Sequence, residues 1–199
     1  MVPKRMMEKG IPARRVYQHS IFCSSRFRRL PLEARVYTIL VASKLKPAAD
    51  FEVGEELAGD LERILRRLKI RYEKGEYDEE HGRDAMYYIS RSVLRARRLK
   101  VLDGESTRGF DSALVSEIGK LYGVPECCIR HFIRSSRDSS PGQIIPRDAP
   151  AEYGYLFHLP CSKKCAESRS LGRAIRETLK RFEPITAFEW SNKSHLVLP

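Results

Sequence analysis

Apolar side chains recur at helical spacing in several stretches of the 199-residue chain. Because positions three and four apart lie on one face of a helix, this pattern predicts amphipathic helices with one buried face each. Pro31 and Asp111 suit the start of a helix, and Gly123 suits the end of one. The helices predicted in this way cover residues 31–45, 56–70, 85–100, 111–122 and 166–182.

Alternation of apolar and polar positions predicts strands in the last third of the chain. Residues 151–159 alternate through three aromatic side chains, and residues 185–190 and 196–198 flank a polar turn. Residues 71–84 are highly charged and contain two glycines, which indicates an exposed turn or hairpin. The predicted fold class is α+β and predominantly helical, with a few short strands near the C-terminus and before the second cysteine pair.

The predicted organisation is a basic N-terminal arm, residues 1–30, followed by a single helix-rich domain, residues 31–199. The first 30 residues mix basic pairs with aromatic side chains and show no clean periodicity. No apolar run is long enough to span a bilayer, and the N-terminus lacks the apolar segment of a signal peptide. We therefore expect a cytoplasmic protein with no membrane partner.

The net charge of +11 is unevenly distributed along the chain. Residues 1–50 carry eleven basic and three acidic side chains, whereas residues 51–150 carry eighteen of each. A localised basic excess is typical of nucleic-acid-binding proteins, although a solvated, charge-rich surface gives the same composition.

Arginines line the polar face of several predicted helices with few acidic side chains among them. Such stripes favour docking on nucleic acid, and structured RNA read through its phosphates more than DNA, because no sequence-reading motif is present. The candidate nucleic-acid-binding residues are Arg91, Arg95, Arg98, Arg169, Arg173, Arg176 and Lys180.

Four of the five cysteines fall in two short segments, and this clustering requires a chemical explanation. Cys127 and Cys128 follow Pro125 at the start of a predicted helix that runs to about residue 135. Cys161 and Cys165 begin the helix over 166–182. Thiolates from both segments, with His131 as an optional fifth candidate, can form a tetrahedral zinc site or hold an iron–sulfur cluster. A helix N-terminus also favours the thiolate form of a cysteine.

Two other interpretations of the cysteines remain open. Disulfides between the two helix starts suit an even number of cysteines. Alternatively, one cysteine acts as a nucleophile in a thiol enzyme or redox protein, with His131 or His158 as its base. His158 also suits a role behind the metal ligands, as a hydrogen-bonding partner, or a plain strand position.

The cysteine segments resemble the paired motifs of a mainly archaeal domain family of unknown function. Residues 123–132 read Gly-Val-Pro-Glu-Cys-Cys-x-x-x-Phe, and residues 158–172 read His-x-Pro-Cys-Ser-x-x-Cys-x-x-Ser-x-x-Leu-Gly. A weaker likeness extends back to about residue 30 and leaves out the basic arm. The resemblance implies that these positions matter and that the protein is archaeal and cytoplasmic, but it implies no particular reaction.

Overall fold

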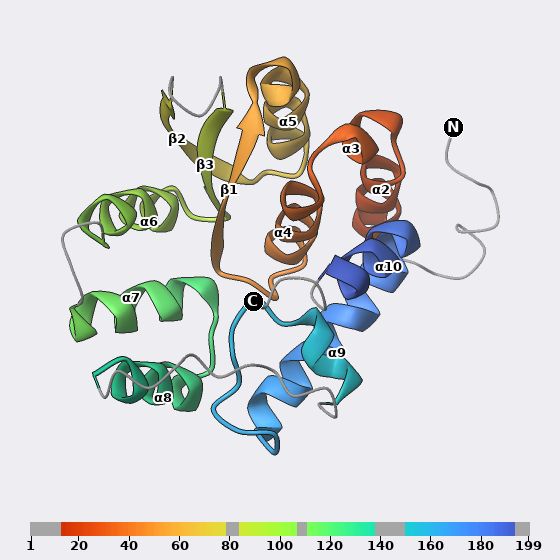
Figure 1. Cartoon of the computed structure of the whole chain (residues 1–199). Coiled ribbons are helices and arrows are strands. Elements are labelled where there is room, and N and C mark those ends of the chain that lie inside the picture. The colour runs from red at the N-terminus through yellow and green to blue at the C-terminus, as the bar shows by residue number, and fades with distance from the viewer. Residues whose placement is uncertain (1–12, 79–83, 107–110, 138–149, 194–199) are drawn as a thin grey trace.

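The computed structural model describes residues 13–78, 84–106, 111–137 and 150–193, and its helices surround a small sheet (Figure 1). None of the helices in these ranges is both long enough and apolar enough to cross a membrane. The helices are α2 (Ala13–Phe22), α3 (Ser25–Arg29), α4 (Leu32–Ala42), α5 (Glu55–Arg67), α6 (Val93–Ser106), α7 (Ser112–Tyr122), α8 (Glu126–Arg137), the 3₁₀ helix η1 (Ala151–Tyr155), α9 (Ala166–Phe182) and α10 (Pro184–Lys193).

The sheet has three antiparallel strands in the order β1-β3-β2. They are β1 (Ala48–Gly54), β2 (Arg71–Asp78) and β3 (Asp84–Ser90). Phe51 of β1 lies opposite Tyr87 of β3, and their rings stack with centroids 6.5 Å apart. The hairpin that residues 71–84 indicate is thus formed by β2 and the start of β3.

The main core lies between one face of the sheet and helices α4, α5, α9 and α10. Alternate residues of a strand point to opposite faces, so Phe51 and Val53 point into this core together with Tyr87 and Ile89. The C-terminal helices complete it from the other side with Ile175, Leu179 and Trp190. This packing fixes α9, the helix that follows the second cysteine pair.

The opposite face of the sheet is covered by α6 and α7. Ala48, Tyr88 and Leu99 form a small second cluster there, against which Leu121 and Tyr122 of α7 pack. The Tyr88 hydroxyl donates a hydrogen bond of 2.6 Å to the Asp103 carboxylate of α6. Gly123 then ends α7 in the left-handed conformation, at φ 76°, and leads directly into α8.

Residues 13–30, the second part of the segment expected to be a basic arm, form α2 and α3. Phe22 and Phe27 are fully buried, with ring centroids 5.0 Å apart, and Phe22 also contacts Phe182 of α9. The Arg28 guanidinium lies 3.2 Å from the buried Glu183 carboxylate. Residues 1–12 lie outside the described residues.

The two predicted strands at 151–159 and 185–190 are wrong. Residues 151–155 form the 3₁₀ helix η1 instead of a strand, and both Tyr153 and Tyr155 are buried in it. Residues 184–193 form α10, which Glu183 caps by accepting a hydrogen bond of 2.6 Å from the Thr186 amide. Residues 196–198 lie outside the described residues, and the strands of the sheet all fall between residues 48 and 90.

The single helix predicted over 85–100 is also wrong in its first part. Residues 84–90 form the central strand β3, and α6 begins only at Val93. Because helices cover both faces of the sheet, Tyr87, Tyr88 and Ile89 are all buried, so the strand shows no alternation. The other five predicted helices are confirmed as α4, α5, α7, α8 and α9.

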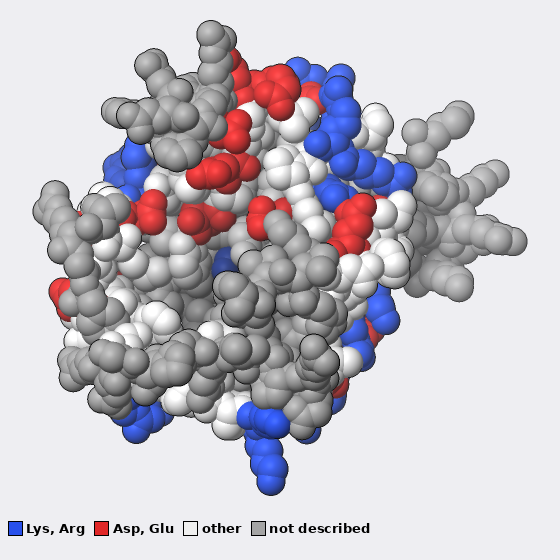
Figure 2. Space-filling view, in the orientation of Figure 1, with Lys and Arg blue, Asp and Glu red and all other residues white. Residues whose placement is uncertain are grey.

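Basic side chains stand at several separate places on the face of the molecule that Figure 2 shows. Figure 2 shows Lys and Arg at the upper right, at the left and along the lower edge, and a row of Asp and Glu above a central hollow. In Figure 1 the helices α6 and α9, which carry the arginine stripes, lie on opposite sides of the molecule.

Candidate metal centre

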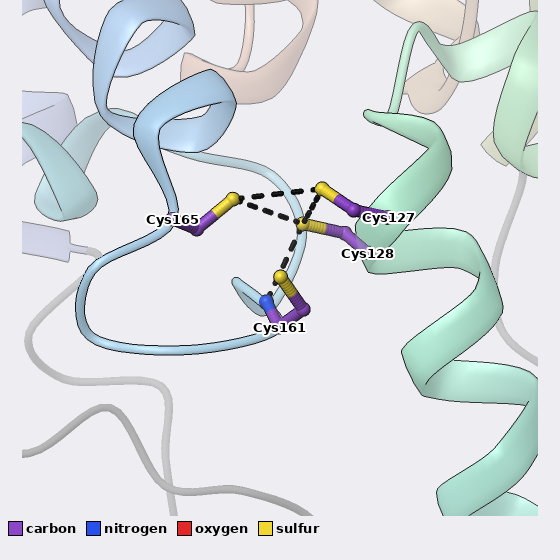
Figure 3. A group of neighbouring side chains, drawn as sticks. All are labelled: Cys127, Cys128, Cys161 and Cys165. Carbon is purple, nitrogen blue, oxygen red and sulfur yellow. Dashed lines mark hydrogen bonds between the residues drawn. The ribbon is translucent and has the colours of Figure 1, made fainter.

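The sulfur atoms of Cys127, Cys128, Cys161 and Cys165 lie within 4.8 Å of one another (Figure 3). The Cys127 and Cys128 sulfurs are 3.8 Å apart, and they lie 3.6 and 3.7 Å from the Cys165 sulfur. The structure thus brings together the two cysteine segments, which are more than thirty residues apart in the sequence. All four thiols are free, and this group is the one set of potential metal ligands among the described residues.

Two helix starts and one loop supply these four side chains. Cys127 and Cys128 lie in the first turn of α8, where Pro125 accepts hydrogen bonds from the amides of Cys128 and Ile129. Cys165 is the N-cap of α9, and its sulfur accepts a hydrogen bond of 3.5 Å from the Ser168 amide. Cys161 lies in the loop before α9 rather than in its first turn, which corrects the expectation that it begins the helix.

The loop that carries Cys161 is anchored by the buried ring of Tyr153. The Tyr153 hydroxyl lies 3.1 to 3.3 Å from the carbonyl oxygens of Ser162, Lys163 and Cys165. Tyr153 belongs to η1, which packs closely on α9. A Cβ atom at Gly172 of α9 would lie only 2.2 Å from the Glu152 carbonyl oxygen of η1, so only glycine fits there. Tyr153 and Gly172 therefore set the position of Cys161 and Cys165 without contacting the sulfurs.

Ser168 connects the cysteine group to His158. Its hydroxyl lies 3.1 Å from the Cys128 sulfur and 3.0 Å from Nε2 of His158. The Cys161 amide donates a further hydrogen bond of 3.4 Å to the Cys128 sulfur. Burial, together with the charge of Lys46, lowers the pKa of His158 to about 4, so the imidazole is neutral at neutral pH. Hydrogen bonds of this kind orient metal ligands.

The four thiols differ in acidity. Burial and hydrogen bonds with Cys165 and Cys128 raise the pKa of Cys127 to about 12, and burial with contacts to Cys165 and Cys127 raises that of Cys161 to about 11. Burial also raises the pKa of Cys128. For Cys165 burial is outweighed by donors, chiefly Ser168, which lower its pKa to about 7. The expectation that the helix starts favour thiolate therefore holds at Cys165 alone, and a metal ion must displace protons from the other thiols.

His131 does not join the cysteine group, although it lies one helical turn from Cys127 and Cys128. Its Nε2 is buried without a hydrogen-bond partner among the described residues. The side chain lines an apolar cavity of about 420 Å³ between α7, α8 and residues 157–159. Cys128 and His158 line the same cavity, so the cysteine group borders it.

Most of the arginines expected to bind nucleic acid are engaged with acidic side chains or the backbone. Arg91 precedes α6 and donates a hydrogen bond of 3.3 Å to the Ala42 carbonyl oxygen, so it does not extend the stripe of that helix. Arg98 binds Glu117 through two hydrogen bonds of 2.7 Å. Arg173 pairs with Glu152 and Arg176 with Glu177. Arg95, Arg169 and Lys180 are exposed.

Sequence reasoning missed Tyr153 as part of the site. Ser168 and Gly172 belong to the second motif, but the sequence assigned them no role. Tyr153 offers no signal in the sequence, because its contacts depend on the fold of η1. Comparisons with protein-family models, with curated proteins and with solved structures found no match for this chain.

Proposed function

We propose that Cys127, Cys128, Cys161 and Cys165 bind one zinc ion, which ties the start of α8 to the start of α9. The three sulfur–sulfur distances of 3.6 to 3.8 Å carry this proposal. A zinc–sulfur bond of about 2.3 Å in tetrahedral geometry places neighbouring sulfurs about 3.8 Å apart. The three sulfurs thus have the spacing of ligands around a single ion.

An iron–sulfur cluster fits this spacing less well than a single ion. Four cysteines bind four iron atoms in a 4Fe–4S cluster and two iron atoms in a 2Fe–2S cluster, so their sulfurs must enclose several atoms rather than one. Here all four sulfurs lie within 4.8 Å of one another. Four thiolates around zinc also leave no open coordination position, which supports a structural site rather than a catalytic one.

The same distances weigh against disulfides as the role of the cysteines. A disulfide requires about 2.05 Å between its two sulfurs, which is much shorter than the distances found here. All four cysteines are free thiols. A thiol enzyme would need one nucleophile beside a base, whereas His158 hydrogen-bonds Ser168 rather than a cysteine. His131 likewise contacts no cysteine through a hydrogen bond among the described residues.

Cobalt substitution tests the zinc site directly. Purified protein, stripped of metal and titrated with Co²⁺, should develop the intense sulfur-to-cobalt charge-transfer absorption of a tetrahedral thiolate site at one ion per chain. Cys161→Ser should weaken it and lower the affinity, whereas Cys23→Ser should leave both unchanged. Cys23 is the matched control because its sulfur lies instead against His19 and the Phe182 carbonyl. Weak absorption in the wild type, or an equal effect of both variants, contradicts the proposal.

Docking on nucleic acid, with RNA favoured, is a second proposal that concerns the surface around the metal centre. Exposed basic side chains flank the cysteines on both segments, with Arg130 and Arg134 on α8 and Arg169 on α9. Lys163 and Lys164 are exposed in the loop between Cys161 and Cys165. Basic side chains also project along the lower edge of Figure 2, where Figure 1 places α8 and α9. This arrangement supports phosphate contacts centred on the zinc site rather than on α6.

Binding to structured RNA should fall steeply as salt rises, because each phosphate contact releases counterions. Arg130→Gln with Arg134→Gln should weaken binding at low salt and make the salt dependence shallower. The control pair Arg63→Gln with Arg66→Gln removes two exposed charges from α5, at the opposite end of the molecule in Figure 1. Equal losses in the two pairs, or no binding at low salt, contradict this second proposal and leave the zinc site untouched.

A further inference from the structure

Lys46 is a fully buried amine inside a cage of aromatic rings. It lies between α4 and β1, and its side chain is buried although it carries an ionisable group. The Nζ atom lies 3.5 Å from the ring centroid of Phe157, 4.5 Å from that of Tyr122 and 4.8 Å from that of Tyr37. The three rings come from α4, α7 and the segment after η1, so the tertiary fold builds the cage.

A cavity of about 320 Å³ opens onto this amine. It is lined by Lys46 and its three rings, and also by Phe51 and the carboxylates Glu33 and Asp50. Figure 2 shows a hollow in the centre of this face, with acidic side chains along its upper edge and a basic side chain in its depth. A small molecule that enters the cavity therefore meets an amine, two carboxyl groups and aromatic walls.

The three rings favour the charged state of the amine through cation–π contacts, but the amine has few polar partners. Its one hydrogen bond among the described residues is a long contact of 3.4 Å with the Tyr122 carbonyl oxygen, and no carboxylate there forms an ion pair with it. Burial lowers the pKa of Lys46 to about 7, against the attraction of Asp50, which raises it. Burial in turn raises the pKa of Asp50. Near neutral pH a large fraction of the amine is therefore uncharged, and it faces a carboxyl group whose pKa burial raises.

The other ionisable groups around the amine come from every element that packs on it. They are Glu33 and Tyr37 of α4, Asp50 of β1, Tyr122 of α7 and His158, which follows Phe157. The charge of Asp103 on α6 raises the pKa of both Asp50 and Tyr122. Burying an amine without a paired carboxylate costs free energy, and a methionine would fill the same space at lower cost. Packing alone therefore does not account for a lysine at this position.

We propose that Lys46 is an amine nucleophile that forms an imine with a small carbonyl compound bound in this cavity. The nitrogen lone pair attacks the carbonyl carbon, and the electron pair of the C=O double bond moves to oxygen, which takes up a proton as the nitrogen loses one. The hydroxyl group then leaves as water after it takes up a proton from solvent, the nitrogen lone pair forms the C=N bond, and the protonated imine loses its remaining N–H proton to solvent. Water is the one by-product, and no oxidant or reductant takes part.

The cavity lining also restricts the class of carbonyl compound. Glu33 and Asp50 repel a second negative charge close to the reacting carbon, and the four aromatic rings favour an uncharged molecule. The substrate class is therefore a small aldehyde or ketone without a carboxylate or phosphate group. The inference does not depend on the identity of the metal, because Lys46 contacts none of the four cysteines.

Reductive trapping tests the proposal on the zinc-loaded full chain. The protein is incubated at pH 7 with glyceraldehyde and cyanoborohydride, and labelled lysines are identified by peptide mass spectrometry. Lys46 should be labelled at least about tenfold faster than the exposed Lys44, because an ordinary lysine with a pKa of about 10.4 is almost fully protonated at this pH. Glyoxylate, which is an anionic aldehyde, should label Lys46 more slowly than glyceraldehyde, relative to Lys44.

Two variants separate a reactive amine from a merely buried one. Lys46→Met should abolish the fast labelling while zinc content and circular dichroism stay unchanged, and Lys44→Met should leave the fast labelling intact. Asp50→Asn should lower the pH at which labelling of Lys46 is half-maximal, because it removes the charge that stabilises the ammonium form. Labelling of wild-type Lys46 no faster than that of Lys44 at pH 7 overturns the proposal, whatever the variants do.

Discussion

Ser168 is the residue through which the metal centre connects to its surroundings. Its hydroxyl contacts both the Cys128 sulfur and Nε2 of His158, and its amide donates to the Cys165 sulfur. Ser168→Ala should lower zinc affinity by about 10- to 100-fold, the usual effect of losing a hydrogen bond to a metal ligand. Competition with a zinc chelator measures this, with Ser170→Ala, an exposed position on the same helix, as control. Equal zinc affinities in the two variants would contradict a role of Ser168 in supporting the metal ligands.

Gly172 matters because α9 approaches the backbone of η1 at this point. A Cβ atom there would lie 2.2 Å from the Glu152 carbonyl oxygen, so Gly172→Ala must push the two elements apart. We expect the free energy of unfolding to fall by about 1–3 kcal/mol, as for other overpacked sites. Gly59→Ala is the control, since no atom lies within 4 Å of its added Cβ, and it should stabilise α5 by about 0.5–1 kcal/mol. Chemical denaturation compares the two, and a neutral Gly172→Ala would contradict the close packing.

Lys46 should make stability depend on pH in a direction opposite to that of a salt-bridged lysine. Burial lowers its pKa to about 7 in the folded protein, whereas the unfolded chain has a pKa of about 10.4. Between these values the unfolded chain binds more protons, so the free energy of unfolding of wild type should rise with pH relative to Lys46→Met. Below pH 7 the amine is charged in the folded protein as well, so the full free-energy cost of burying that charge lowers stability. Denaturation of both proteins from pH 6 to 9 measures the difference, and a constant difference would contradict the buried, unpaired amine.

Among the secondary-structure elements, helices could be predicted from the sequence wherever one face is buried and the other is solvated. The helices α5 and α9 show this pattern clearly, and so do the caps Asp111 and Gly123 of α7. The central strand β3 was mistaken for a helix because both of its faces are buried, which removes alternation. The helix α10 was mistaken for strand because its short apolar stretch fits either periodicity, and the capping Glu183 is recognisable only once the fold is known.

The cysteine group shows the same division between local and tertiary information. Clustering of four cysteines identified the candidate ligands, and the structure brings these four side chains together. The sequence could not exclude His131, because helical spacing alone places it near Cys127, whereas the packing of α7 on α8 turns it toward an apolar cavity. It also could not reveal Tyr153, which reaches the cysteine loop through the fold of η1.

Removal of the metal should loosen the elements that carry the ligands and leave the sheet in place. The start of α8 and the loop before α9 are joined mainly at the cysteines, whereas β3 is paired on both sides by other strands. After chelation, hydrogen exchange should speed up in residues 126–130 and 158–168 and stay slow in residues 85–89. Uniform exchange across the chain would instead mean that the metal supports the whole fold, and unchanged exchange would mean that it supports neither segment.

In the molecule as a whole, the four-cysteine group and the caged amine lie on two sides of one short segment. Phe157 covers the Lys46 amine, and the next residue, His158, hydrogen-bonds the serine that contacts Cys128. In the view of Figure 2 the basic side chains stand at several separate places, so the net charge of +11 does not by itself mark a binding surface on this face.

X-ray absorption at the zinc edge, combined with elemental analysis of the purified protein, examines the proposed zinc site itself. We expect one zinc per chain with four sulfur neighbours at about 2.3 Å, and no nitrogen or oxygen ligand. Iron in place of zinc, a metal–metal distance typical of a cluster, or protein that stays free of metal in excess zinc with all four thiols reactive would contradict it.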